Sequence, residues 1–183
     1  MKKKTLISII AVALVLCVSV GGVLAWLTDK TDPVVNTFTV GNIDLTLAET
    51  TTNYKMVPGA TIDKDPVVTV KANSEKCWVF VKFEKSANLD DFITYTAATG
   101  WTRLEGVDDE VYYRVQDATT EDVTYSVLAN DKVAVKDTVT KGMMDELKAD
   151  GAVQPKLTFT AYAIQYAGFD TAAGAWAEVS KTN

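Results

Sequence analysis

Histidine is absent from all 183 residues of the chain. It is the usual base that activates a serine or cysteine nucleophile, and it supplies two ligands of the H-E-x-x-H zinc site. Hydrolases of both kinds are therefore excluded. The sequence also lacks a glycine-rich phosphate loop after a strand and a G-x-S-x-G turn, which excludes the nucleotide sites and α/β-hydrolase sites built on those motifs.

Cysteine is nearly absent, with Cys17 and Cys77 as its two occurrences. Cys17 lies in an apolar run near the N-terminus, and Leu16 before it is larger than the small residue of a lipoprotein signal. A domain that keeps Cys77 alone has no internal disulfide and depends on its core for stability. Cys77 begins the apolar run CWVFVKF, so we expect it to be buried as a small hydrophobic residue.

A long stretch near the N-terminus, from Thr5 to Thr28, contains no charged residue. Three lysines follow the first methionine, and then come an apolar run from Leu6 to Val20, two helix-breaking glycines and Ala25. This order predicts that residues 1–25 are a signal peptide, cut between Ala25 and Trp26. The alternative is an uncleaved membrane anchor formed by residues 6–25, because the uncharged run is about long enough to span a bilayer. Both interpretations place the rest of the chain outside the cytoplasm.

Basic residues are outnumbered, since 18 lysines and arginines accompany 24 aspartates and glutamates. The formal charge of −6 becomes −9 when the three lysines of the signal peptide are removed. Such a charge argues against nucleic acid and anionic lipid as partners, so membrane contact is expected only through the signal segment. Proline is sparse and no low-complexity tract is present, so we expect residues 36–183 to fold as a single domain.

The mature chain consists mostly of short β-branched and aromatic runs, which are typical of strands. The run from Cys77 to Phe83 is apolar on both faces and is predicted to be a central, covered strand. Hairpins are predicted to join 67–72 to 77–83, 101–104 to 111–115, and 123–128 to 133–139. The remaining predicted elements are strands over 36–48, with a bulge at Gly41-Asn42, and over 154–166, helices over 141–149 and 170–179, and a helical turn at Asp90-Asp91.

About eight strands with one or two helical inserts predict a mainly β fold. The expected architecture is an antiparallel β-sandwich of jelly-roll or immunoglobulin type. The tryptophans and tyrosines are expected to fill its core, and a sugar- or peptide-binding face is the alternative. Paired acids such as Asp63/Asp65 and Asp90/Asp91 are expected to be solvated, and a calcium site is the alternative.

The opening stretch GGVLAWLTDKTDPVVNTFTVGNIDLTL resembles the signal and mature start of proteins processed by the SipW-type signal peptidase. Three later blocks extend the similarity over most of the chain: MVPGATIDKDPVVTVKANSEKCWVFVKFE, the GWTRLEG and VYYR segments, and LTFTAYAIQYAGFDTAAGAWA. On these motifs the chain is similar to the TasA/camelysin-like exported proteins of Gram-positive bacteria.

This resemblance implies a jelly-roll-like sandwich that is secreted to the cell surface and the biofilm matrix. It also implies self-association into fibres, in which the N-terminal segment of one subunit completes the sheet of the next. Residues 26–35 would then be an extended segment and linker, and the alternative is a loose terminus before a domain whose own first strand begins at Asn36. The candidate assembly strand comprises Trp26, Leu27, Val34, Val35, Phe38 and Val40.

The predicted function is therefore that of a structural matrix protein. The camelysin resemblance implies a metallopeptidase as the alternative, but a zinc enzyme without histidine departs from the usual ligand sets. We accordingly assign no catalytic residue, no cofactor and no metal ligand. A monomeric surface adhesin or ligand-binding module is the third interpretation.

Overall fold

The computed structural model describes residues 41–51 and 54–182, and these form a mainly β structure. Its helices are α2 (Leu89–Phe92), α3 (Lys141–Glu146) and α4 (Ala172–Val179), with 3-10 turns η1 (Ala129–Asp131) and η2 (Ser180–Thr182). Its strands are β1 (Leu45–Ala48), β2 (Thr61–Asp63), β3 (Val67–Val70), β4 (Cys77–Lys85), β5 (Ile93–Thr94), β6 (Thr102–Arg103), β7 (Glu110–Gln116), β8 (Val123–Ser126), β9 (Lys132–Val135) and β10 (Leu157–Gln165).

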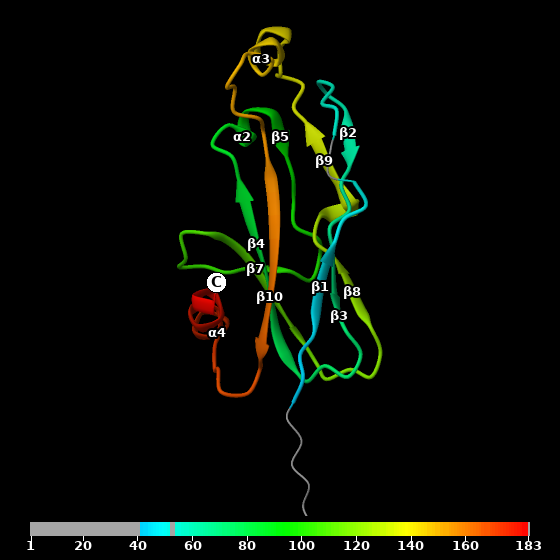
Figure 1. The fold of residues 1–183 in the computed structure, drawn as a ribbon, viewed down its shortest axis with the longest axis vertical. Helices are drawn as coiled ribbons and strands as arrows, with labels where there is room; N and C mark the ends of the chain where they lie inside the picture. Colours follow the sequence, from blue (N-terminus) through cyan, green and yellow to red (C-terminus); the bar gives the residue numbers. More distant parts are fainter. Residues whose placement is uncertain (1–40, 52–53, 183) are drawn as a thin grey trace, which may run out of the picture. The chain divides into compact units, whose positions relative to one another are not determined.

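The strands form three antiparallel sheets that make up two layers (Figure 1). One layer is the four-stranded sheet β10-β4-β7-β6. The other consists of β1-β3-β8 and β2-β9-β5, which follow one another along the layer. Where the chain passes from one of these sheets to the next, one hydrogen bond continues each ladder: Lys64 N donates to Asp131 O (2.8 Å) beyond the β2–β9 pair, and Val127 N donates to Pro66 O (2.9 Å) beyond the β3–β8 pair. The predicted antiparallel sandwich is thus confirmed.

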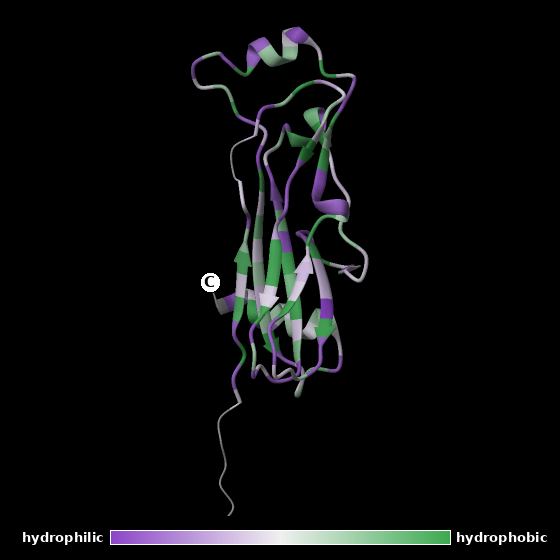
Figure 2. Cartoon of the chain, turned by 90° about the vertical axis from the view of Figure 1, so that its right-hand side faces the viewer, coloured by the Kyte–Doolittle hydropathy of each residue, from purple (hydrophilic) through white to green (hydrophobic). Residues whose placement is uncertain are grey.

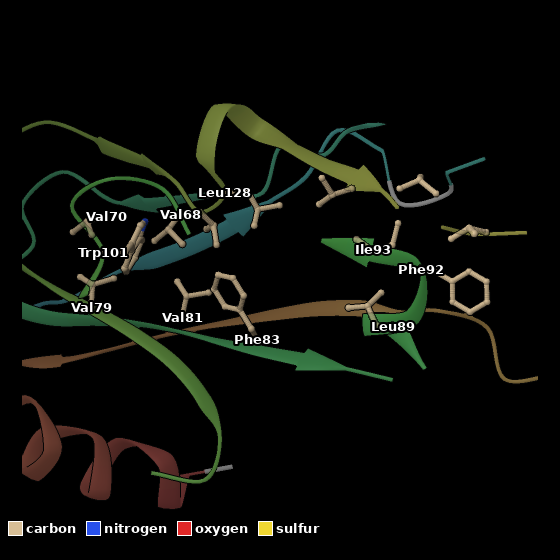
Figure 3. Packing of buried hydrophobic residues seen from close by; sticks show 14 of the residues in the cluster. Val68, Val70, Val79, Val81, Phe83, Leu89, Phe92, Ile93, Trp101 and Leu128 are labelled. Carbon is tan, nitrogen blue, oxygen red and sulfur yellow. The ribbon is translucent and has the colours of Figure 1, made fainter. Parts of the chain in front are cut away.

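The main core lies between the two layers. Figure 3 shows Val68 and Val70 from one layer facing Val79, Val81 and Phe83 from the other, and all five side chains are buried. These positions alternate along β3 and β4, as a pleated strand requires. Figure 2 shows the same pattern as apolar residues gathered along the strands and hydrophilic residues in the connecting loops.

A second apolar cluster lies on the outer face of the four-stranded sheet, under helix α4. Trp78 and Phe80 of β4 belong to this cluster, and the ring of Phe80 lies 5.4 Å from the ring of Trp176. Strand β4 is therefore covered on both faces, which confirms the prediction made from its continuous apolar sequence. Cys77, at its start, is fully buried as predicted.

Several other predicted elements are confirmed. Strands β6 and β7 pair with each other, and β10 occupies most of the predicted 154–166 strand. Helix α3 begins where expected and ends three residues early, whereas α4 begins two residues after its predicted start and ends where expected. The hydroxyl oxygen of Thr171 caps α4 by accepting a hydrogen bond from Gly174 N (3.1 Å). None of the helices in this described part of the chain is long and apolar enough to cross a membrane.

Two predicted hairpins are wrong. Strands β3 and β4 lie in different layers, because the link at 73–76 carries the chain across the sandwich and Asn73 adopts a positive φ of 64°. Strands β8 and β9 belong to successive sheets of one layer, because Asn130 and Asp131, both at φ 55°, bend the chain onward without reversing it. In both cases the runs are strands as predicted, but their partners are different.

The predicted first strand is also shorter than expected. Residues 41–44 are not in a strand, and they pair with the turn that follows β3 through Lys71 N to Asp44 O (2.9 Å) and Glu75 N to Asn42 O (2.8 Å). Strand β1 is the domain's own strand and pairs with β3 in register Leu45 to Val70. Residues 36–40 of the prediction lie outside the described residues.

Candidate assembly groove between β1 and β10

Strands β1 and β10 lie side by side at one edge of the sandwich (Figure 1). Within the described residues each is the last strand of its sheet, since β1 pairs there only with β3 and β10 only with β4. No backbone hydrogen bond joins the two strands within residues 41–51 and 54–182. The part of the sandwich that the structure describes is therefore open along this edge.

The register of β10 against β4 decides which backbone groups face the open edge. At the two ends of this ladder, Tyr166 N donates to Lys76 O and Ser86 N donates to Lys156 O, each at 2.9 Å. Hydrogen-bonded and non-hydrogen-bonded pairs alternate in an antiparallel ladder, so the even-numbered residues of β10 bond to β4. The odd-numbered residues from Leu157 to Gln165 direct their N–H and C=O groups to the edge, where the described residues provide no partner.

A groove with a volume of about 370 Å³ lies at the start of β10, beyond the end of β1. A second hollow of about 360 Å³ adjoins it and shares Lys64, Lys156 and Leu157. Strand β1 ends at Ala48, and the chain from Glu49 onward forms part of the walls. The apolar side chains that line the larger groove are Met56, Ile62, Leu89, Ile93, Val133, Pro155 and Leu157.

Lys64 is a buried cation in the wall shared by the two hollows. Its ammonium nitrogen lies 2.6 Å from Glu49 Oε1, and the two side chains are only 9% and 17% exposed. The same nitrogen lies 5.0 Å from the ring centre of Tyr54 and 5.2 Å from that of Phe159. A carboxylate and two aromatic faces together compensate for removing the lysine from water.

This cluster holds the segment after β1 against the sandwich. Tyr54 donates its hydroxyl proton to Glu49 Oε1 (2.7 Å), and burial, followed by this bond, raises the pKa of Tyr54. Thr50 donates its backbone N–H to Asp65 Oδ1 (3.1 Å) and its hydroxyl to the other carboxylate oxygen. The hydrogen bonds from Thr50 lower the pKa of Asp65. One wall of the groove is thus fixed by polar contacts, and the rest is apolar apart from Gln154 and Lys156.

The residues predicted from sequence to act in processing and assembly lie outside the described residues. They are Ala25 and Trp26 at the cleavage site and Trp26, Leu27, Val34, Val35, Phe38 and Val40 of the assembly strand. The predictions about them stay predictions.

Sequence reasoning missed Lys64 and Glu49. In the segment TIDKDPVV, Lys64 stands between two aspartates and has the appearance of a solvated turn residue. The available signal was its place two residues before Pro66, at the junction of β2 and β3, where strand alternation directs the side chain inward. The predicted turn Val57-Pro58-Gly59-Ala60 is confirmed, with Gly59 at φ 74° and Ala60 N donating to Val57 O (3.0 Å).

One acid of each acidic pair or triplet in the sequence forms an ion pair with a lysine. Asp63 pairs with Lys132, Asp90 with Lys85, Asp109 with Lys82 and Asp122 with Lys71. Within the described ranges, no three residues among histidine, cysteine, aspartate and glutamate come together as a metal-binding group.

These features define a class: a mainly β sandwich with an open edge and a groove beside it. The sequence profile of the camelysin metallo-endopeptidase family matches residues 1–92, half of the chain, and the chain belongs to this family. The predicted TasA/camelysin resemblance is thereby confirmed. No curated protein and no solved structure matches the chain.

The family name implies zinc, and the residues of this chain do not fit it. Zinc sites of peptidases take histidine ligands, and the sequence has none. Cys77 is fully buried, and burial raises the pKa of its thiol to about 11, which opposes the thiolate that binds a metal.

Proposed function

We propose that this protein is a secreted structural subunit of the cell surface or biofilm matrix. In this proposal a SipW-type signal peptidase removes residues 1–25, and Trp26 becomes the new N-terminus. If the signal is not cut, residues 6–25 keep the protein on the membrane. The mature chain then assembles into fibres by donating its N-terminal segment to a neighbouring subunit.

The observation that carries this proposal is the unpaired edge of β10. Five residues of this strand direct backbone donors and acceptors to a side where the described chain has no partner. An extended peptide that pairs there satisfies these groups, and its alternate side chains enter the adjacent apolar groove. The candidate donor, Trp26 to Val40, contains six apolar residues suited to such positions.

An edge of this kind needs an occupant. Exposed edges with free backbone groups favour uncontrolled pairing with other chains, and natural proteins cover or charge them. Donation of a strand from an identical subunit covers the edge and also propagates the assembly, because each subunit both donates and accepts.

Two variants of the mature chain test the mechanism. The first lacks residues 26–35, and the second carries Ala161→Pro, which removes one edge-facing N–H and leaves the even-numbered bonds to β4 in place. The N-terminus of the unmodified chain is first established by mass spectrometry, and filaments are then imaged by electron microscopy.

We expect filaments from the chain that begins at Trp26 and none from either variant, with unchanged circular dichroism in all three. Filaments from the shortened chain would refute strand donation. The fibre role as a whole would be refuted if the unmodified mature chain remained monomeric at high concentration.

A surface metallo-endopeptidase is the second candidate, and the description of the family favours it. It predicts bound metal and cleavage of casein by the purified chain, both abolished by a chelator. The absence of histidine argues for the structural role. A monomeric adhesin is the third candidate, and it predicts no concentration-dependent assembly.

A further inference from the structure

The two arginines of the chain are held in different ways. Arg103 is bonded to the backbone, because its Nη1 donates to Leu104 O and to Val111 O, both at 3.0 Å. Arg114 has no hydrogen-bond acceptor and no carboxylate partner in the described residues, where every ion pair is made by a lysine. An unpaired arginine in a chain with an excess of acids is unusual.

Arg114 lies against two aromatic rings on the inner face of β7. Its guanidinium carbon lies 3.4 Å from the ring centre of Tyr125 and 5.4 Å from that of Trp101. The indole N–H of Trp101 donates to Ser126 O (2.8 Å), and the Tyr125 hydroxyl donates to Gln116, so both rings are fixed. The Tyr125 ring covers one flat face of the guanidinium, and the Trp101 ring, at 77° to that of Tyr125, lies beside it. The N–H groups that lie in the guanidinium plane and point away from Trp101 are left for an acceptor.

The free-energy cost of burying the Arg114 guanidinium is incompletely compensated by its contacts. Arg114 is half-buried, its Nε is buried without a partner, and burial lowers the pKa of its guanidinium. A buried donor without an acceptor costs stability, and such positions in native proteins call for an explanation. A ligand that binds Nη1 and Nη2 of Arg114 and neutralises its charge would explain the burial.

The terminal nitrogens are approachable from the edge of the sandwich formed by β7 and β8. Among the residues that the structure describes, β6 pairs with β7 only at Tyr112 and Tyr113, β7 has no strand partner at Arg114 on that side, and β8 is the last strand of its sheet. Gly100, at φ +91°, lies beside the guanidinium. A Cβ at this position would be 3.4 Å from Nη2 and 3.5 Å from Nη1, so the glycine leaves that space free.

We propose that Arg114 binds a carboxylate through Nη1 and Nη2, and that an aspartate or glutamate of a second copy of the chain supplies it. The two coplanar oxygens of a carboxylate match two guanidinium N–H groups. A second copy can supply the carboxylate, because the exposed acids Glu105, Glu121 and Asp150 form no ion pair within the described residues. This inference rests on the proposed assembly, and it adds a contact at the edge away from β1 and β10.

The test measures the critical concentration for filament formation by the mature chain. Arg114→Gln removes the charge at the site, and Lys181→Gln removes one from an exposed lysine at the C-terminus as a matched control. We expect the first variant to raise the critical concentration about tenfold, the size expected for one charge-assisted pair, and the second to leave it unchanged. For the unmodified chain, sodium acetate is expected to raise the critical concentration more than sodium chloride does at equal ionic strength, because acetate occupies the Arg114 site.

Each outcome decides the inference. If Arg114→Gln does not fold, the acetate comparison on the unmodified chain decides alone. Filaments that are indifferent to both the substitution and acetate overturn the inference and leave the proposed assembly standing. If no chain forms filaments, the proposed assembly fails and the second-copy carboxylate is overturned with it. Nitrogen-15 signals of Arg114 that move with acetate and not with chloride would then assign the site to a free carboxylate.

Discussion

At the scale of single residues, the least ordinary feature is a buried lysine beside an open groove. Lys64 and Glu49 lie 2.6 Å apart with little exposure to solvent, and Tyr54 and Phe159 surround the cation. Removing one partner of a buried pair leaves an uncompensated charge, whereas replacing both can be nearly neutral. The pair is therefore tested by comparing single and double substitutions.

Glu49→Gln is predicted to lower the free energy of unfolding by about 2–3 kcal/mol, because it leaves the Lys64 ammonium buried without a counter-charge. The double substitution Glu49→Leu with Lys64→Met is expected to recover stability to within about 1 kcal/mol of the unmodified chain. Urea unfolding followed by circular dichroism measures both values.

The matched control is Asp63→Asn, which breaks the neighbouring ion pair with Lys132, where the side chains are 85% and 49% exposed. An exposed pair contributes little, so we expect a change below about 0.5 kcal/mol. Equal losses for Glu49→Gln and Asp63→Asn would show that Lys64 is not held as a buried cation.

Cys77 gives a prediction about pH. Burial raises the pKa of its thiol from an ordinary value of 9.0 to about 11. Between these values the unfolded chain releases a proton that the folded chain keeps, so stability is unaffected below pH 9 and falls as pH rises toward 11. The loss attributable to Cys77 is expected to be on the order of 2 kcal/mol at pH 11.

Cys77→Val isolates this effect, because tyrosines also titrate in the same range. Urea unfolding at pH 8 and at pH 11 is expected to show a smaller loss for the variant than for the unmodified chain. Parallel losses in the two proteins would mean that the thiol does not contribute.

The burial of single side chains was predictable from the sequence wherever the alternation of residues along a strand decides which face each one occupies. The two faces of β4 and the burial of Cys77 follow from the run CWVFVKF. Lys64 and Arg114 were not predictable, because a charged residue is buried only when tertiary partners meet it. Those partners, Glu49, Tyr125 and Trp101, are distant in sequence.

At the scale of elements, two helices carry the same cap and differ in what they cover. The Thr171 hydroxyl oxygen caps α4 and that of Thr140 caps α3, each by accepting a backbone N–H three residues on. Helix α4 buries Ala172, Ala175 and Trp176, whereas α3 contains no buried residue.

Thr171→Ala is therefore predicted to lower the free energy of global unfolding by about 1 kcal/mol. Thr140→Ala is predicted to change it by less than about 0.5 kcal/mol, because the loss is confined to fraying of an exposed helix. Urea unfolding measures the global values, and amide exchange in α3 reports the local opening. A Thr140→Ala loss as large as that of Thr171→Ala would mean that α3 is part of the cooperative core.

Element existence was predicted better than element pairing. Helix caps, turn residues and alternating runs act locally and are visible in the sequence. Whether the strands flanking 73–76 pair or cross between layers depends on what their inner faces meet, and a valine run suits both arrangements. The positive φ angles of Asn73, Asn130 and Asp131 redirect the chain, and asparagine and aspartate are the residues that tolerate them.

At the scale of the whole described unit, one sheet carries apolar clusters on both faces. The inner cluster joins all three sheets, and the outer cluster joins the four-stranded sheet to α4. Because β4 contributes side chains to both clusters, disruption of one cluster exposes apolar side chains that belong to the other. The mainly β class was predictable from strand count and spacing, whereas the division of one layer into two sheets depends on bends at Pro66 and at 127–131.

Unfolding is consequently predicted to be a single cooperative transition. Val81→Ala removes a fully buried side chain from the inner cluster, and Trp176→Ala removes one from the outer cluster. Each is expected to move the entire transition to lower urea, by about 1–3 and about 3–5 kcal/mol respectively, without separating tryptophan fluorescence from far-ultraviolet circular dichroism. An early fluorescence phase in Trp176→Ala, with circular dichroism unchanged, would show that α4 opens independently. The outer face of the sheet, with Trp78 and Phe80, would then be an accessible apolar surface and not a second half of one core.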